Sequence, residues 1–159
     1  MTRIRDYTPD DREALRRLVS ELHELVRSFD PDLALGEKIL NRYFDQLLAK
    51  QAGSAGGVFV AEAPDRELVG FTVLYGRVHP PMVDERPDPF AWVAELFVRE
   101  AHRGQGLGEA LMARAEAHAR ALGVYKIELS VVAHNQAAHR FYERLGYRDR
   151  SQIMSKRLR

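Results

Sequence analysis

The chain has 159 residues, 45% of them hydrophobic, a size and composition that suit one domain over residues 1–159 with a sizeable core. Its 24 Lys and Arg residues nearly balance its 23 Asp and Glu residues, so the charge gives no reason to expect a nucleic-acid partner. Cysteine is absent, which excludes disulfides, thiolate–metal sites and a cysteine nucleophile.

The N-terminal part of the chain predicts one short strand and two helices. It lacks the apolar core of a signal peptide, and no segment approaches the roughly 20 apolar residues of a membrane span, so we expect a cytoplasmic protein without a membrane partner. Residues 2–7 predict a strand. Residues 9–26 place leucine and valine at helical spacing behind Pro9 and Asp10, which predicts an amphipathic helix. Residues 36–51 predict a second helix between two turn-forming segments.

The middle of the chain predicts an antiparallel hairpin followed by a loop. Residues 58–63 and 67–79 are short runs of apolar and β-branched residues joined by a turn segment, which is typical of two paired strands. Residues 80–89 (PPMVDERPDP) combine proline with acidic side chains. Because proline cannot continue a helix or a central strand, we expect this segment to be irregular.

The second half of the chain alternates strand and helix. Residues 90–98 predict a strand, residues 106–122 a helix with leucine and alanine in register, and residues 125–132 another strand. These three segments form a β–α–β unit. Antiparallel strands therefore come first and a parallel crossover comes later, so we expect an α/β fold with a mixed, mostly antiparallel central sheet flanked by helices.

A last helix and a last strand are predicted near the C-terminus. Residues 135–146 have Asn135 at the position of an N-cap and Gly146 at the position that ends helices. Residues 147–158 (YRDRSQIMSKRL) predict a final strand or hairpin that closes the chain. No internal repeat or low-complexity segment is present.

Three glycines at alternate positions lead into the helix of the β–α–β unit, in the sequence RGQGLG from Arg103 to Gly108. Glycines there leave the first helical N–H groups unscreened, and the helix dipole adds positive potential, a combination that binds phosphate. A Walker loop would need Lys after Gly108, and a dinucleotide fold would need glycine in place of Glu109. The alternative, that the glycines only form a tight turn between strand and helix and bind no ligand, remains open. Residues 103–108 fit a third phosphate-binding pattern, in which Arg or Gln is followed by two residues, Gly, one residue, and then Gly or Ala.

Two motifs resemble the GNAT superfamily of acyl-CoA-dependent N-acetyltransferases. ELFVREAHRGQGLGEALM, at residues 95–112, is similar to the strand, pyrophosphate loop and helix that hold coenzyme A in that family. NQAAHRFYERLGY, at residues 135–147, is similar to the family's later motif and follows in the right order. The first half of the chain matches only in layout. The resemblance implies a GNAT-like fold with a C-terminal βαβ cofactor-binding unit and acetyl-CoA as cosubstrate.

The resemblance also implies which residues hold acetyl-CoA. Backbone amides of the glycine loop would bind the pyrophosphate, and the preceding strand would run beside the pantetheine arm. An amide near Val98 would polarise the thioester carbonyl as an oxyanion donor. Asn135 would lie near the pantetheine or phosphate, although a plain N-cap role is the alternative and the two can coexist. The implied residues are Leu96, Phe97, Val98, Arg103, Gly104, Gln105, Gly106, Leu107, Gly108 and Asn135.

Two further residues are implied to be catalytic. An alkyl ammonium has a pKa of about 10.4 and must lose a proton before it attacks a thioester. Glu95 lies among apolar residues, where a carboxylate is costly unless it faces water or a polar cleft, and the resemblance implies that it is the general base. The alternatives are a solvent-facing or Arg-paired Glu95, or His79 as base. The resemblance implies that Tyr142 is the general acid for the leaving thiolate, with a packed helix aromatic as the alternative.

The sequence leaves the acceptor open. We expect direct attack by a primary amine of a small molecule in a ternary complex, since no Cys and no Ser–His pair indicate a covalent intermediate. A protein or peptide N-terminus, a lysine side chain, or an inactive acyl-CoA-binding regulatory module are the alternatives. Candidates to line the acceptor site are the early helices, Trp92, and the loop carboxylates Asp84, Glu85 and Asp88. The histidines lack metal-ligand spacing, so no metal is expected, and a homodimer is compatible with the sequence.

Overall fold

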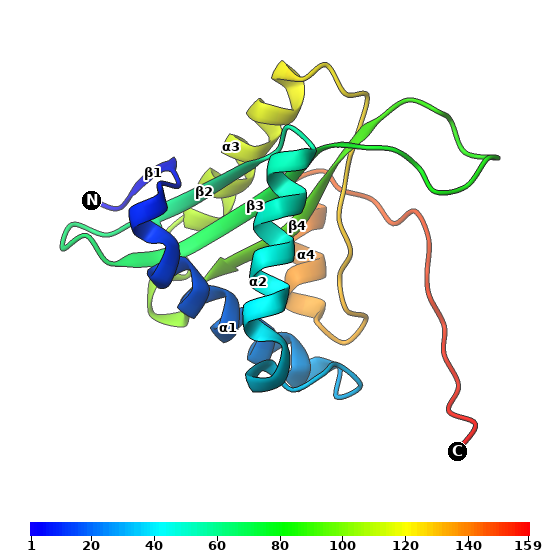
Figure 1. Cartoon of the computed structure of the whole chain (residues 1–159), viewed down its shortest axis with the longest axis horizontal. Coiled ribbons are helices and arrows are strands. Elements are labelled where there is room, and N and C mark those ends of the chain that lie inside the picture. The colour runs from blue at the N-terminus through cyan, green and yellow to red at the C-terminus, as the bar shows by residue number, and fades with distance from the viewer.

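A five-stranded sheet forms the centre of the computed structural model, which describes residues 1–159 (Figure 1). The strands lie in chain order, and each pairs antiparallel with the next except the last two, β4 and β5, which are parallel. The strands are β1 (Arg3–Asp6), β2 (Gly57–Glu62), β3 (Leu68–Val78), β4 (Phe90–Val98) and β5 (Ile127–Glu128). The mixed, mostly antiparallel α/β fold expected from the sequence is confirmed.

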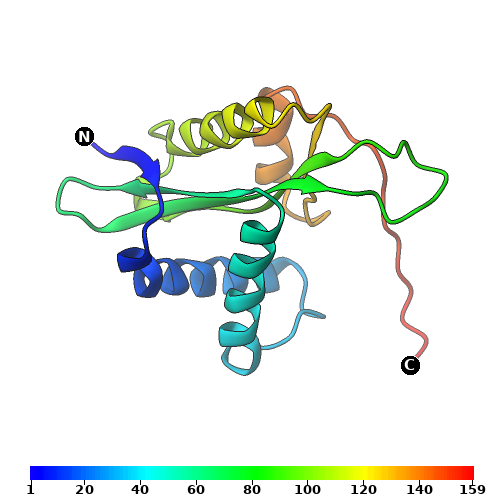
Figure 2. The same ribbon diagram turned by 45° about the horizontal axis from the view of Figure 1, so that its top comes forward.

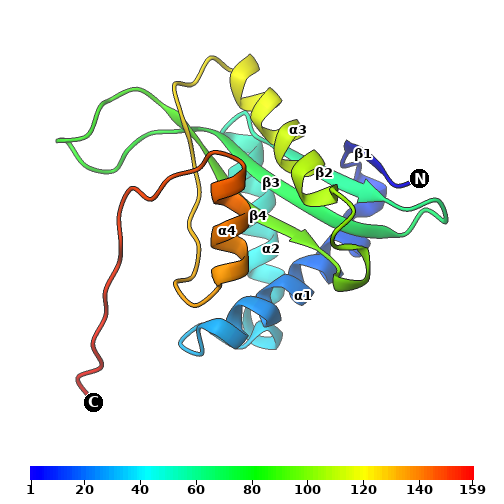
Figure 3. The same cartoon turned by 180° about the vertical axis from the view of Figure 1, so that it is seen from behind.

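Helices cover both faces of this sheet. One face carries α1 (Arg12–Phe29) and α2 (Gly36–Gly53), and the other carries α3 (Leu107–Ala121). Figure 2 shows the two layers on opposite sides of the sheet, and Figure 3 shows α4 (Gln136–Arg144) beside α3. Two short 3₁₀ segments, η1 (Pro9–Asp11) and η2 (Glu100–His102), precede α1 and α3. None of the helices combines the length and the apolar character that a bilayer crossing requires.

Each helical layer has its own hydrophobic core. On the first face, Leu15 and Leu18 of α1 pack with Phe44 of α2 against Phe71 of β3, and all four are almost fully buried. On the other face, α3 buries Leu111 and its neighbours against the sheet. Burial of a side chain of this size stabilises a fold by about 1.5–3 kcal/mol. The leucine spacing of α1 follows the helical period, which is why the sequence predicts this helix correctly.

A β-bulge interrupts the pairing of β3 with β4. Val73 lies opposite Glu95 and the next residue, Leu74, lies opposite Val93, so Ala94 is the extra residue of β4. Bulges bend a strand and redirect the side chains beside them. Because residues opposite each other in a sheet share a face, Glu95 lies with Val73 on the α1–α2 face.

An ion-pair network ties β1 and β2 to the start of α1. The guanidinium of Arg5 donates to both carboxylate oxygens of Asp11, at 2.7 and 2.8 Å, and its Nε donates to Glu62 at 2.8 Å. The bond from Arg5 lowers the pKa of Asp11 to about 2, and the same arginine lowers the pKa of Glu62. Charges that are largely removed from water are thereby compensated.

Most predicted elements are confirmed, including both early helices, the hairpin and the β–α–β unit. Two predictions near the C-terminus are wrong. Only Ile127 and Glu128 of the predicted strand 125–132 pair in the sheet, and residues 147–158 form no strand. A strand is stable only when its backbone N–H and C=O groups find a neighbouring strand, and within this chain these segments have no such neighbour.

Candidate active site

The glycine loop presents free backbone amides. Gly104 and Gly106 have φ values of +73° and +77°, a conformation that side chains with a Cβ rarely adopt, and the space around both is open. No N–H from Gly104 to Glu109 finds an acceptor within the chain, and the first bond of the helix runs from Ala110 N–H to the Gly106 carbonyl, at 3.0 Å. Free amides at a helix N-terminus attract anions.

The third glycine of the loop has a different role. A Cβ on Gly108 would lie 3.2 Å from the ring of Phe141, closer than packed carbons normally approach. Gly108 therefore allows α4 to pack against the first turn of α3. The sequence alone does not distinguish the three glycines. In the structure, Gly104 and Gly106 are required by the backbone conformation of the loop, and Gly108 by the packing of the helices.

The outer edge of β4 is free beside this loop. β4 pairs with β5 only at Ala91 and Trp92, so residues 93–98 have no strand on that side. Phe97 is buried in the α1–α2 core with 7% of its surface exposed, so only its backbone faces the edge. The Nε of Arg103 donates to the Val98 carbonyl at 2.8 Å. This bond joins the glycine loop to the free edge of β4, where an extended ligand can pair as an added strand.

Glu95 lies at the bulge in the middle of that edge strand. Its carboxyl group makes no hydrogen bond or ion pair, which sets it apart from the carboxylates near β1, and burial raises its pKa to about 8. Burial disfavours the charged form of a carboxylate because the surrounding protein solvates charge less well than water. A carboxyl group with this pKa can both accept and release a proton near neutral pH.

Tyr142 lies on α4, near enough to Glu95 to be affected by its charge. Its ring packs edge-on against Phe141 and Tyr147, at centroid distances of 5.1 and 5.7 Å. Burial, and then the negative charge of Glu95, raise the pKa of the Tyr142 hydroxyl, so the phenol keeps its proton at neutral pH. Only one side-chain nitrogen or oxygen is inaccessible to solvent and also lacks a hydrogen-bond partner, and it is Nδ1 of His102. The unpartnered polar ends of Glu95 and Tyr142 are therefore still reached by solvent.

Asn135 positions α4. Its Oδ1 accepts a hydrogen bond from the N–H of Ala138 at 3.2 Å, so the predicted N-cap is confirmed. Gly146, with φ of +94°, follows the helix as predicted. These local signals place Tyr142 on a helix whose start and end are both determined by its sequence.

Thr72 is a residue that the sequence analysis missed. It lies on β3, is fully buried, and its Oγ1 donates to the carbonyl of Glu95 at 2.9 Å. This hydrogen bond anchors the backbone of Glu95 beside the bulge. A threonine inside an apolar strand is a weak signal, because only the register of β3 against β4 reveals what its hydroxyl contacts.

The other candidates lie at various distances from Glu95. His79 is exposed beyond the end of β3, roughly 20 Å along the strand from Val73 at about 3.3 Å per residue. Trp92 lies opposite Tyr75 and shares the α1–α2 face with Glu95. The loop carboxylates extend from the far end of the β3–β4 hairpin, where Asp88 pairs with Arg86 (Figure 1). No group of three or more His, Asp or Glu side chains is arranged to hold a metal ion.

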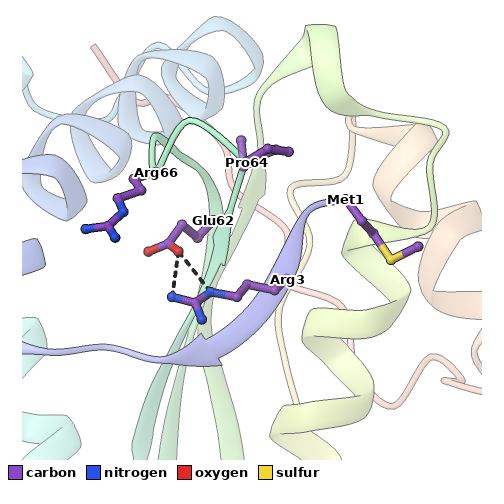
Figure 4. Close-up of a pocket in the computed structure, with 6 residues that line it drawn as sticks. Met1, Arg3, Glu62, Pro64 and Arg66 are labelled. Carbon is purple, nitrogen blue, oxygen red and sulfur yellow. Dashed lines mark hydrogen bonds and ion pairs between the residues drawn. The ribbon is translucent and has the colours of Figure 1, made fainter.

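A surface depression of about 300 Å³ lies at the opposite edge of the sheet, beside β1. Figure 4 shows Arg3 bound to Glu62 within it, at 2.8 Å, with Met1, Pro64 and Arg66 around them. The strands β2 and β3 separate this depression from β4. Arg3 and Glu62 belong to the ion-pair network that holds β1, so we assign this depression no catalytic role.

A mixed sheet with a free edge along β4, next to an amide-rich loop at a helix N-terminus, is an arrangement that suits an extended, phosphate-bearing ligand. Comparison with known proteins gives the family. Residues 17–147 match the acetyltransferase (GNAT) family, and the chain belongs to this family. The resemblance seen in the two motifs is confirmed.

Three relatives illustrate this membership. The uncharacterized N-acetyltransferase YycN of Bacillus subtilis is 30% identical over 59% of this chain and 56% of its own length. The uncharacterized N-acetyltransferase MJ1207 of Methanocaldococcus jannaschii is 30% identical over 94% of this chain and 62% of its own length. An aminoglycoside N(6′)-acetyltransferase of Stenotrophomonas maltophilia is 26% identical over 69% of this chain and 71% of its own length. The chain thus spans less than two thirds of the length of the first two.

Solved structures share the fold. A tetramutant of the BH1408 protein from Bacillus halodurans superposes with a TM-score of 0.84 and 27% identity, over 98% of this chain and 99% of that one. AAC(6′)-Iy in complex with a CoA-containing bisubstrate analogue superposes with a TM-score of 0.73 and 19% identity, over 100% of this chain and 99% of that one. The second likeness concerns the fold alone.

Proposed function

We propose that residues 1–159 act as one N-acetyltransferase domain, which transfers an acetyl group from acetyl-CoA to a primary amine of a small molecule by direct attack. The observation that carries this proposal is an unpaired Glu95 on a strand with a free edge beside the amides of the glycine loop, near enough to Tyr142 for its negative charge to raise the pKa of the tyrosine. Acetyl-CoA supplies the thioester, and the chain supplies binding, orientation and proton transfer.

The residues of the cofactor side have complementary roles in this proposal. The free amides from Gly104 to Glu109 bind the pyrophosphate, and Arg103 holds the loop to the end of β4. The free edge of β4 from Leu96 to Val98 aligns the pantetheine arm through backbone hydrogen bonds. An amide near Val98 stabilises the negative charge that develops on the thioester oxygen. Asn135 contributes through its remaining amide donors.

Glu95 takes a proton from the substrate ammonium, and the freed nitrogen forms the C–N bond as the C–S bond breaks. Transfer from a group of pKa about 10.4 to a carboxylate of pKa about 8 costs about 3 kcal/mol. Transfer to a carboxylate at its ordinary pKa of 4.5 would cost about 8 kcal/mol. The raised pKa therefore makes Glu95 a better matched base. Tyr142 gives its proton to the departing thiolate and is reprotonated by the second proton that the nitrogen loses as the amide forms.

A small amine is the acceptor that we favour. Tyr75 and Trp92 lie opposite each other on the α1–α2 face, next along the strands from Glu95. Aromatic rings attract cations, and the Tyr75 ring already has the Nζ of Lys50 over it, at 5.4 Å from its centroid. One relative in the family acts on aminoglycosides, which are small polyamines. A peptide N-terminus or lysine remains the second candidate, and an inactive acyl-CoA-binding module is disfavoured because both Glu95 and Tyr142 are present.

An acceptor screen tests the reaction. Acetyl-CoA labelled in the acetyl group is incubated with polyamines, aminoglycosides, amino acids and short peptides, and kcat/KM is compared. We expect transfer to a small amine that persists with EDTA, since the proposal needs no metal. A peptide preferred by more than about a hundredfold, or about 2.7 kcal/mol, would refute the small-amine acceptor. No transfer to any amine, with acetyl-CoA still bound, would indicate the inactive module.

A matched pair of glycine variants tests the cofactor site. Gly106 and Gly123 both have positive φ, +77° and +70°, and open surroundings, so a valine causes similar backbone strain at either position. Gly106→Val is expected to lose most acetyl-CoA affinity by calorimetry, because it distorts the free amides, whereas Gly123→Val, which follows α3, keeps it. Equal affinities in the two variants would contradict the assignment of the loop.

A further inference from the structure

The last residue of the motif at residues 135–147 has a partner outside its own helix. Tyr147 follows the end of α4, and its backbone N–H donates to the carbonyl of Tyr142 at 3.0 Å. Its hydroxyl donates to Oε1 of Glu116, on α3, at 3.1 Å. Burial, and then the negative charge of Glu116, raise the pKa of the Tyr147 hydroxyl, so the hydroxyl keeps the proton that this hydrogen bond requires. Tyr147 is therefore fixed to α4 through its backbone and to α3 through its side chain.

The carboxylate of Glu116 is itself held in place. Its other oxygen, Oε2, pairs with Arg120 of the next helical turn at 3.1 Å, and only 22% of the Glu116 side chain is exposed. The bond from Tyr147 to this carboxylate is charge-assisted, a kind of hydrogen bond that is stronger than one between neutral groups. A strong bond to an acceptor that is itself held gives the ring of Tyr147 one preferred position.

Tyr142, in contrast, has no hydrogen bond to direct its hydroxyl. Ring packing alone sets where the hydroxyl points, through edge-on contacts with Phe141 and Tyr147. Phe141 belongs to the same turn of α4, so its ring moves with Tyr142 whenever the helix moves. The contact with Tyr147, at a centroid distance of 5.7 Å and an angle of 70° between the rings, is the one that is anchored on another helix.

The helix that anchors this contact is the one that begins at the glycine loop. α3 starts at Leu107, directly after Gly106, and Glu116 lies nine residues further on, about 14 Å along the helix at 1.5 Å per residue. Figure 3 shows α4 beside α3. The hydrogen bond between Tyr147 and Glu116 therefore connects the surroundings of Tyr142 to the helix whose first turn faces the cofactor loop.

We propose that Tyr147, held by Glu116, is a positioning residue that fixes the ring of Tyr142 and so directs its hydroxyl at the departing thiolate. This inference rests on the proposed role of Tyr142 as general acid. Without the hydrogen bond to Glu116, the ring of Tyr147 is free to turn, and Tyr142 loses the contact that orients it. The amides of the glycine loop are unchanged by this loss, so proton donation weakens while acetyl-CoA still binds.

Single variants test the hydrogen bond, with kcat counted per acetyl-CoA-binding site measured by calorimetry. Tyr147→Phe keeps the ring and removes the hydroxyl, so kcat is expected to fall by about three- to tenfold at unchanged acetyl-CoA affinity. Glu116→Ala is expected to do the same, whereas Glu116→Gln, whose amide oxygen accepts the same bond, is expected to restore kcat. Arg120→Ala is the control, because it removes the ion pair of Glu116 and leaves the bond to Tyr147. Unchanged kcat in Tyr147→Phe, or equal losses in Glu116→Gln and Glu116→Ala, would overturn the proposal.

A double variant separates positioning from a purely structural role. If Tyr147 acts through the hydroxyl of Tyr142, then Tyr147→Phe added to Tyr142→Phe should lower kcat no further, because the group that it positions is already gone. Losses that multiply in the double variant would refute the positioning role and leave the acid role of Tyr142 intact. Unchanged kcat in Tyr142→Phe alone would refute the acid role, and the positioning role with it.

Discussion

Carboxyl groups on and beside this sheet differ in their partners. Near β1, Asp11 and Glu62 are bound by Arg5, and both have lowered pKa values. At the β4 bulge, Glu95 has no partner, and burial raises its pKa to about 8. The charges of Asp11 and Glu62 are compensated by an arginine, whereas the half-buried carboxyl of Glu95 has no partner to stabilise its ionised form. A site that keeps such a group is a candidate for proton transfer.

The largest expected effect is on turnover. Glu95→Gln removes the base but keeps the shape of the side chain, so kcat/KM should fall by about 100- to 10,000-fold near neutral pH. In the unchanged enzyme the rate at saturating acetyl-CoA should rise with pH and level off above about 8, the pKa of Glu95. The variant should lack this plateau and depend more steeply on high pH.

Glu62→Gln is the control, since it removes a carboxylate that belongs to the ion-pair network. It should leave the midpoint of the pH–rate profile unchanged even if it lowers stability. A Glu95→Gln enzyme with unchanged turnover and the same midpoint would show that another group is the base.

The same comparison predicts opposite effects of pH on stability. The pKa of Glu95 is raised from 4.5 to about 8 on folding, so its ionisation destabilises the fold progressively as pH rises through this window. Glu95→Gln should therefore increase the free energy of unfolding at pH 9 by about 2–4 kcal/mol, while having little effect at pH 4.

Asp11 should behave in the opposite way. Its pKa falls from 3.8 to about 2 on folding, so its stabilisation is present above pH 4 and is lost as pH falls toward 2. Asp11→Asn should cost about 2 kcal/mol at pH 7. Urea unfolding across this pH range measures both variants, and equal pH profiles for the two would refute the distinction.

A smaller effect on turnover is expected at Tyr142, the proposed general acid. Tyr142→Phe removes only the hydroxyl, and should lower kcat by about 10- to 100-fold with little change in acetyl-CoA affinity. Because a thiolate is a fair leaving group at neutral pH, the loss should be smaller than that at Glu95. Phe141→Leu, which alters the neighbouring ring but no hydroxyl, is the control. Unchanged kcat in Tyr142→Phe would assign Tyr142 to packing.

The smallest effect is expected at Thr72, which positions Glu95 through its carbonyl. Thr72→Val removes the hydrogen bond of 2.9 Å at nearly constant volume, and should lower kcat/KM by about three- to tenfold and move the midpoint of the pH–rate profile. Thr72→Ser retains a hydroxyl and should restore both. Loss of stability without any shift in the profile would assign Thr72 a purely structural role.

The sequence alone determined the elements whose signals are local. The spacing of Leu15, Leu18 and Leu22 predicted α1, and Asn135 with Gly146 predicted the two ends of α4. The alternate glycines predicted an anion site because the conformation of Gly104 and Gly106 and the start of α3 lie within one short segment. Helical period, capping and turn chemistry depend on neighbours in the chain, so they are readable from it.

Only the tertiary structure decided what depends on distant partners. The register of β3 against β4 produced the bulge at Ala94 and brought Thr72 to Glu95. The packing of α4 explained Gly108 through Phe141. The absence of a neighbouring strand left residues 147–158 extended, although their pattern favours a strand. The burial of a side chain, the pairing of a strand and the pKa of a carboxyl group depend on groups far apart in sequence, so they cannot be predicted from the composition of one segment.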